Sequence, residues 1–127
     1  MAEVEVDYGI VWYNENVGGE NMLPIAINDI KNKILNTVDV SKIYLFGSYA
    51  RGTQTEQSDY DFFVVIPDGS VRPLEAMQKI YCSLAKSPMK VPVDVLAAYE
   101  KDFEQRKAMP SSIEQTIQKE GVLLYGA

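Results

Sequence analysis

Two groups of residues in this 127-residue sequence have the side chains that chemistry on a phosphate group requires. The first is Gly47-Ser48, which follows the apolar run KIYLF, and a helix is expected to begin at the serine. The first N–H groups of a helix lack partners within it and carry partial positive charge, so they attract anions. Glycine lets a phosphate approach the backbone, and the serine hydroxyl can add a hydrogen bond. Alone this is a weak indication, because a plain turn with a capping serine looks the same.

Three aspartates form the second group of candidate residues. Asp59 and Asp61 stand two positions apart at the start of the apolar stretch DYDFFVVIP. On a strand they would share one face, about 6.6 Å apart. Asp94 lies inside the apolar segment KVPVDVLAA, where an acidic residue is unusual. If the two strands are neighbours, the three carboxylates converge and repel one another.

Such repulsion has to be offset. Two like charges about 4 Å apart repel by about 1 kcal/mol in water and about 4 kcal/mol at an effective dielectric constant of about 20. Either some carboxyl groups stay protonated or a cation lies among them. Oxygen ligands in a chain without histidine favour Mg²⁺, with Mn²⁺ as a second candidate. The structural alternative is that Asp59 and Asp61 face solvent where a strand begins, while Asp94 pairs with a lysine or arginine.

The periodicity of the apolar residues predicts the elements that position these groups. We expect strands at 3–12, 42–46, 59–67, 90–98 and in VLLY near the C-terminus, and helices at 23–37, from Ser48 to Gly52, at 73–86, at 99–107 and from Ser112 to Gly121. Pro24 suits the first turn of its helix, and Pro92 suits an edge strand or a strand start. This order predicts an α+β fold, a small mixed sheet with helices packed mainly on one face.

Length and composition bear on the domain organisation of the chain and on its cellular compartment. The length favours one domain, which we assign to 22–127, with 1–21 as an N-terminal extension that could add a strand; Met22 could also be the true start. No stretch approaches the ~20 apolar residues of a membrane span, and no signal peptide is visible, so we expect a cytoplasmic protein without a membrane partner. The single Cys82 is expected to be a small packed side chain.

The charge balance bears on partners. The net charge is −6, which opposes direct binding to a nucleic-acid backbone. An acidic surface suits a basic protein partner, or a nucleotide delivered with a metal ion. The absence of histidine excludes histidine general bases and most zinc sites.

The segment GSYARGTQTEQSDYD, residues 47–61, resembles the Gly-Ser…Asp-x-Asp signature of the DNA polymerase β-like nucleotidyltransferase superfamily. Its extended form, Gly-Ser-x-Ala-Arg-Gly…Ser-Asp-x-Asp, is similar to that of the minimal nucleotidyltransferases (MNT), small proteins encoded beside HEPN-domain partners. The likeness includes Asp94 and, more loosely, the tail, so it covers most of 22–126. Residues 1–21 depart from the compact family pattern.

The resemblance implies roles for the candidate residues. Gly47 and Ser48 would hold the β and γ phosphates of ATP. Asp59 and Asp61 would carry two Mg²⁺ ions, and Asp94 would complete the metal site and help to deprotonate an acceptor hydroxyl. Arg51, one turn into the short helix, can reach the triphosphate or pair with a carboxylate, and the sequence leaves both readings open.

Three functions remain in competition. The first is a type VII-like antitoxin, which transfers AMP from ATP to a hydroxyl, in the family typically a tyrosine, of a HEPN ribonuclease toxin and can form a hetero-oligomer with it. The second is a small-molecule nucleotidyltransferase of the aminoglycoside type, although the 33 residues after Asp94 leave little room for the usual second domain. The third is a non-catalytic antitoxin that acts by binding alone, and a retained cluster of repelling carboxylates argues against it.

Overall fold

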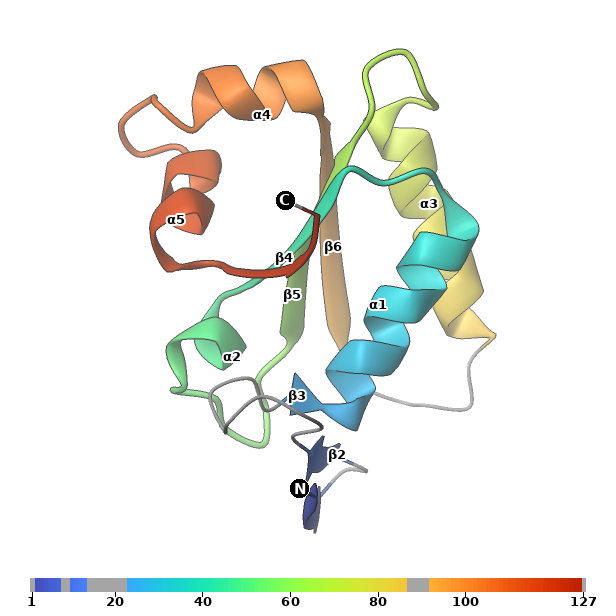
Figure 1. The fold of residues 1–127 in the computed structure, drawn as a ribbon, viewed down its shortest axis with the longest axis vertical. Helices are drawn as coiled ribbons and strands as arrows, with labels where there is room; N and C mark the ends of the chain where they lie inside the picture. The colour runs from blue at the N-terminus through green and yellow to red at the C-terminus, as the bar shows by residue number, and fades with distance from the viewer. Residues whose placement is uncertain (1, 8–9, 14–22, 87–91, 127) are drawn as a thin grey trace.

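The computed structural model describes residues 2–7, 10–13, 23–86 and 92–126, and its main element is a four-stranded sheet (Figure 1). The strand order is β6-β5-β4-β7. The four strands are β4 (Lys42–Phe46), β5 (Tyr60–Ile66), β6 (Val93–Tyr99) and β7 (Val122–Tyr125). β4 runs antiparallel to β5 and β7, whereas β5 and β6 are parallel. The sheet is therefore mixed, as the sequence predicts, and β6 and β7 are its edges.

Helices lie on both sides of this sheet (Figure 1). The two helices of 13 residues each, α1 (Ile25–Thr37) and α3 (Pro73–Ala85), cover one face. The shorter α4 (Glu100–Arg106) and α5 (Ile113–Glu120) cover part of the other face, and α2 (Ser48–Arg51) follows β4. The α+β prediction is confirmed. The expectation that helices lie mainly on one face holds for the two long helices, while part of the second face stays open.

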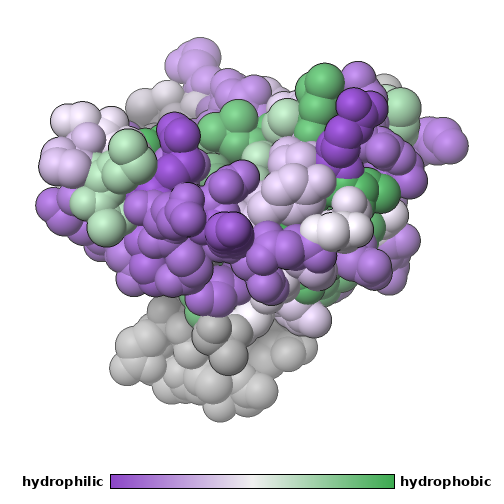
Figure 2. All heavy atoms as spheres, turned by 90° about the horizontal axis from the view of Figure 1, so that it is seen from above, coloured by the Kyte–Doolittle hydropathy of each residue, from purple (hydrophilic) through white to green (hydrophobic). Residues whose placement is uncertain are grey.

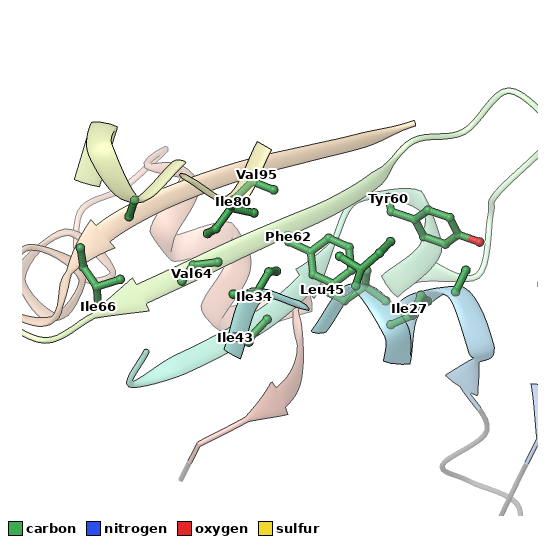
Figure 3. Close-up of a cluster of buried hydrophobic side chains, with 13 residues drawn as sticks. Ile27, Ile34, Ile43, Leu45, Tyr60, Phe62, Val64, Ile66, Ile80 and Val95 are labelled. Carbon is green, nitrogen blue, oxygen red and sulfur yellow. The ribbon is translucent and has the colours of Figure 1, made fainter. Parts of the chain in front are cut away.

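Each sheet face has its own cluster of buried side chains. Figure 3 shows the larger cluster, which includes Ile27, Ile34, Ile43, Phe62, Val64 and Ile80. On the second face the Phe103 ring lies 5.6 Å from the Tyr44 ring and 5.5 Å from the Phe63 ring, measured between centroids. Because residues alternate between faces along a strand, odd-numbered residues of β5 face the second cluster. Asp61 is one of them, so it lies on the partly open face.

Local signals read from the sequence account for most element boundaries. Pro73 occupies the first turn of α3, where its missing N–H costs nothing. The Ser112 hydroxyl oxygen accepts a hydrogen bond from the Gln115 N–H at 3.0 Å, so it caps α5 as predicted. Gly52 ends α2 in the left-handed conformation, also as predicted.

The N-terminal region differs from expectation. Instead of one strand at 3–12, β1 (Ala2–Asp7) and β2 (Ile10–Tyr13) pair antiparallel, and β2 also pairs with β3 (Leu23–Pro24). Alternation continues through both arms of a hairpin, so it does not reveal where the chain reverses. Pro24 belongs to β3, and α1 begins one residue later.

Two further expectations need correction. β6 begins at Val93 and ends at Tyr99, one residue beyond the predicted end; residues 90 and 91 of the predicted strand lie outside the described residues. Cys82 is exposed rather than packed, because it lies on the solvent side of α3. The face in Figure 2 is largely hydrophilic, with small separate hydrophobic areas. No helix within the described ranges has the length and hydropathy to cross a membrane.

Candidate active site

The backbone of Gly47 has a conformation that only glycine adopts readily. Its φ is 76° and its ψ is −155°, in a region that side chains exclude. A Cβ atom placed there would lie 2.2 Å from Oδ2 of Asp61. The glycine is thus needed for two reasons: the turn itself, and the close approach of the Asp61 carboxylate to the backbone.

The turn leads directly into α2, whose N-cap is Gly47 rather than Ser48. The Gly47 carbonyl accepts hydrogen bonds from the N–H groups of Ala50 and Arg51, both at 3.1 Å. The N–H groups of Ser48 and Tyr49 precede this bonding and stand at the open end of the helix. Ser48 is therefore not the capping serine of a plain turn. Its position beside open N–H groups suits contact with an anion.

Asp61 and Asp94 meet through the register of the sheet. Phe46 of β4 pairs with Asp61 of β5, and Asp61 pairs with Asp94 of β6. Paired residues on adjacent strands point to the same face. Asp61 and Asp94 therefore lie side by side at the end of the second face, and Gly47, which directly follows Phe46, turns the chain into α2 beside them.

The prediction that Asp59 and Asp61 share one strand face is wrong, because β5 begins at Tyr60 and Asp59 lies just before it. It is nevertheless close enough to act on Asp61 electrostatically. Burial raises the pKa of Asp61 above its ordinary value of 3.8, and the adjacent Asp94 and then Asp59 raise this pKa further. Arg51 acts in the opposite direction on the pKa of Asp61. The three predicted aspartates therefore interact, with Asp61 at the centre.

The three aspartates are suited to bind a hard cation such as Mg²⁺, although they do not already form a closed site. Among the described residues no group of three carboxylate or other ligand side chains is already gathered around one point. Asp61 and Asp94 are neighbours in register, whereas the backbone ladder does not fix the position of Asp59. The donor set is made of carboxylate oxygens, which Mg²⁺ and Mn²⁺ prefer. A positive ion among them would offset the repulsion that raises the pKa of Asp61.

Arg51 has a partner that the sequence did not reveal. Its Nη1 lies 3.6 Å from Oε1 of Glu120, at the end of α5, and both side chains are about half exposed. An exposed pair of this length contributes little to stability, roughly 0–1 kcal/mol. Arg51 is thus available to a stronger anion. Glu120 is 69 positions away in sequence, and only the packing of α5 beside α2 brings it to the site.

Two tyrosines connect the Gly-Ser turn to the aspartates. The rings of Tyr49 and Tyr60 are stacked, with centroids 4.1 Å apart and planes 24° apart. Tyr60 is buried among the side chains of the larger cluster, at one end of it (Figure 3). Burial, and then the adjacent Tyr49 phenol, raise the pKa of Tyr60, so this phenol stays neutral. The stack fixes α2 against β5.

Comparison with known proteins agrees with this geometry. Residues 27–124 match the family model described as a nucleotidyltransferase domain. The chain belongs to the nucleotidyltransferase domain family. The matched range includes Gly47, Ser48, Asp61 and Asp94, and the chain is accordingly a nucleotidyltransferase enzyme.

Individual relatives of this nucleotidyltransferase carry related descriptions. A Methanocaldococcus jannaschii protein, named as a candidate protein adenylyltransferase, is 32% identical over 106 residues, which is 84% of this chain and 97% of the relative. A crystal structure of a toxin–antitoxin with AMP-PNP is 26% identical with a TM-score of 0.52, covering 79% of this chain and 73% of that one. A candidate nucleotidyltransferase from Sulfolobus solfataricus is 19% identical with a TM-score of 0.54, covering 79% and 77% of the two chains, and shows the shared fold.

One surface hollow lies away from the three aspartates of the site. It measures about 620 Å³ and is lined by the end of α1, by Asp39, by Lys79 and by the turn at Gly69–Val71, and none of Asp59, Asp61 and Asp94 contributes to it. Its hydroxyl groups are already used, since Thr37 donates to the Lys33 carbonyl and Ser70 to the Pro67 carbonyl. This hollow is therefore separate from the candidate active site.

Proposed function

We propose that this nucleotidyltransferase is a metal-dependent protein adenylyltransferase that acts as an antitoxin. It transfers AMP from ATP to a tyrosine hydroxyl of a cognate HEPN-type ribonuclease toxin. The transferase domain is residues 22–127, preceded by an extension of 1–21, and the protein works in the cytoplasm. The observation that carries the proposal is the close approach of the Gly47 turn to Asp61, which pairs in register with Asp94 on the adjacent strand.

The residues at this end of the sheet have separate roles in the proposed transfer. The open N–H groups at Ser48, with Arg51, bind the β and γ phosphates. Asp59, Asp61 and Asp94 would hold two Mg²⁺ ions, which would supply charge stabilisation to the attacking and leaving oxygens when bound. Asp94 takes the proton of the acceptor hydroxyl, whose oxygen forms a bond to the α-phosphorus. The bond from that phosphorus to the bridging oxygen breaks, and pyrophosphate leaves.

The choice of a protein acceptor rests on the relatives and on the size of the chain. The Methanocaldococcus jannaschii relative, matched over 97% of its length, bears a protein adenylyltransferase name. The structural neighbour at 26% identity is a toxin–antitoxin with a bound ATP analogue. A net charge of −6 also suits a partner that binds RNA and is therefore basic.

The test is a transfer reaction with purified proteins. The chain is incubated with ATP, Mg²⁺ and the toxin encoded beside it, and the toxin mass is measured together with the modified residue. We expect one or more AMP groups on a toxin tyrosine. Asp59→Asn combined with Asp61→Asn should abolish the reaction, while Asp39→Asn, an exposed acid ahead of β4, should leave it intact.

Two outcomes would contradict the proposal. An unmodified toxin that is still neutralised would indicate an antitoxin that acts by binding alone. An unmodified toxin together with a nucleotidylated aminoglycoside would indicate a small-molecule enzyme.

A further inference from the structure

The two edges of the four-stranded sheet differ in how they could pair with a further strand. At β6, the Tyr81 hydroxyl of α3 accepts a hydrogen bond from the Val95 N–H at 2.8 Å and donates a longer one, of 3.4 Å, to the Val95 carbonyl. The charged Asp94 lies in the same strand. Occupied backbone groups and charged side chains both hinder the addition of a strand to an edge. The β6 edge is therefore protected.

The opposite edge, β7, lacks comparable protection. Within the described residues its strand partner is β4 alone. The segment GVLLYG, residues 121–126, contains no charged residue and no proline, in a chain whose net charge is −6. Three of its apolar side chains are exposed: Val122 by 39%, Leu123 by 42% and Tyr125 by 41%. An edge strand of this composition is open to pairing with another strand.

The side chains of β7 are complementary to themselves when two copies run antiparallel. Val122 pairs with Leu45 of β4 and Tyr125 with Ile43, and both partners belong to the larger cluster. Paired residues point to the same face, so Val122 and Tyr125 share one face, which the register shift between β4 and β7 makes possible. Antiparallel pairing brings the start of one strand beside the end of the other. Val122 of each copy then meets Tyr125 of the other, and a β-branched residue opposite an aromatic one is a favourable pair.

The charges beside the two ends of β7 are complementary in the same arrangement. Glu120 lies two residues before the strand begins, and its side chain is 48% exposed. At the other end Lys42 of β4 lies against Gly126, where an added Cβ atom would be 2.9 Å from the Lys42 Cγ. Two antiparallel copies bring Glu120 of each toward Lys42 of the other. This match of opposite charges favours a second copy over a strand of unrelated sequence.

We propose that β7 is a homodimer interface and that its occupant is β7 of a second copy of this chain. The two sheets join edge to edge across a two-fold axis and form one continuous sheet. The backbone groups on the outer side of β7 then pair with those of the second copy, and the exposed apolar side chains of both strands become covered. Leu123, in the middle of the paired strands, lies near the axis, so the two copies of this residue are close to each other.

Sedimentation velocity of the full chain over a range of concentrations measures this self-association. Leu123→Lys puts two like charges near the axis and should raise the dimer Kd by about tenfold or more. Leu123→Glu should do the same, whereas an equimolar mixture of the two variants should form dimers again, because opposite charges then meet. Leu96→Lys is the matched control, since Leu96 is 38% exposed on the protected edge strand β6, and it should leave the Kd unchanged.

Hydrogen exchange of the unsubstituted chain adds a measurement that does not depend on how the variants fold. Amide exchange in Val122–Tyr125 should slow as the concentration of the chain rises. A chain that stays monomeric throughout the series would overturn the inference, as would equal weakening of the dimer by Leu123→Lys and Leu96→Lys, or a mixture of the two Leu123 variants that stays monomeric. Exchange in β7 that slows only when the toxin is added would also overturn it, because the edge would then belong to the toxin.

Discussion

Asp61 and Asp94 occupy facing positions on the parallel strands β5 and β6, and both side chains leave the sheet on the face that α4 and α5 only partly cover. The parallel pairing of β5 and β6 puts the two residues side by side, although 33 positions separate them in sequence. Burial and the neighbouring carboxylates raise the pKa of Asp61. The folded protein therefore holds two acidic groups where their charges oppose each other.

The repulsion between Asp61 and Asp94 predicts that the Asp61 carboxylate lowers the free energy of unfolding. Because the folded-state pKa of Asp61 is raised above 3.8, its favourable contribution is complete below that pH and is lost as pH rises through the raised pKa. In the presence of a chelator at pH 8, Asp61→Asn should therefore raise the unfolding free energy by about 1 kcal/mol. Thermal unfolding at pH 8 and pH 4 measures the effect.

The increase should shrink at the lower pH, since protonation of the Asp61 carboxyl group in the unsubstituted protein removes the charge that opposes Asp94. Asp39→Asn, at an exposed position before β4, is the control and should change little at either pH. A loss of stability in Asp61→Asn at pH 8 would mean that the charges do not oppose each other as described.

Gly47→Ala should damage both the fold and the site. The new Cβ atom would meet Oδ2 of Asp61 at 2.2 Å, and the residue would keep a φ of 76° with a ψ of −155°. Such backbone strain costs about 1–3 kcal/mol. Gly52→Ala is the control, because Gly52 also has a φ of 76° but nothing lies within 4 Å of its Cβ position.

We expect both variants to lose stability in urea unfolding, and only Gly47→Ala to lose ATP binding as well. Equal ATP affinity in the two variants would show that the contact between Gly47 and Asp61 has no part in the nucleotide site.

Tyr60→Phe should leave stability unchanged or raise it by about 1 kcal/mol. The Tyr60 hydroxyl is buried, and the described part of the chain supplies no partner in hydrogen-bonding geometry. Removing it takes away an unpaired polar group and keeps the ring stack with Tyr49. Tyr60→Ala, which removes the stack as well, should cost about 3–5 kcal/mol. A clear loss of stability in Tyr60→Phe would reveal a hydrogen bond at this oxygen.

Substitutions of Arg51 and of Glu120 should have opposite effects on ATP binding. If Arg51 leaves Glu120 to contact the triphosphate, Arg51→Gln should weaken ATP binding about tenfold, the usual value of a charge-assisted hydrogen bond. Glu120→Gln removes the competing carboxylate and should strengthen ATP binding slightly, with little change in stability. Similar small effects of both substitutions on ATP binding would assign Arg51 to the structural ion pair alone.

The parts of the fold that the sequence predicts well are those with local causes. Ser112 caps α5, Pro73 starts α3, and β4 has the predicted bounds, because capping, proline geometry and a short apolar run act within a few residues. The Gly47-Ser48 turn is also predicted from the local sequence. The N-terminal hairpin was missed, because alternating residues fit one long strand as well as two short ones.

The candidate site divides in the same way. The sequence identifies Ser48, Asp61 and Asp94 by residue type, yet it does not give the register that pairs Asp61 with Asp94. Glu120 carries no local signal, because only the folded chain brings its carboxylate to 3.6 Å from Arg51.

Calorimetric titration of ATP in the presence and absence of Mg²⁺ tests the central claim most directly, namely that the carboxylates of Asp61 and Asp94 and the Gly47-Ser48 turn form one metal-dependent nucleotide site. The account predicts that ATP binds the unsubstituted chain with Mg²⁺, that a chelator removes most of this affinity, and that Asp61→Asn with Asp94→Asn removes the dependence on Mg²⁺. ATP binding of equal strength with Mg²⁺, with chelator and in the double variant would contradict it.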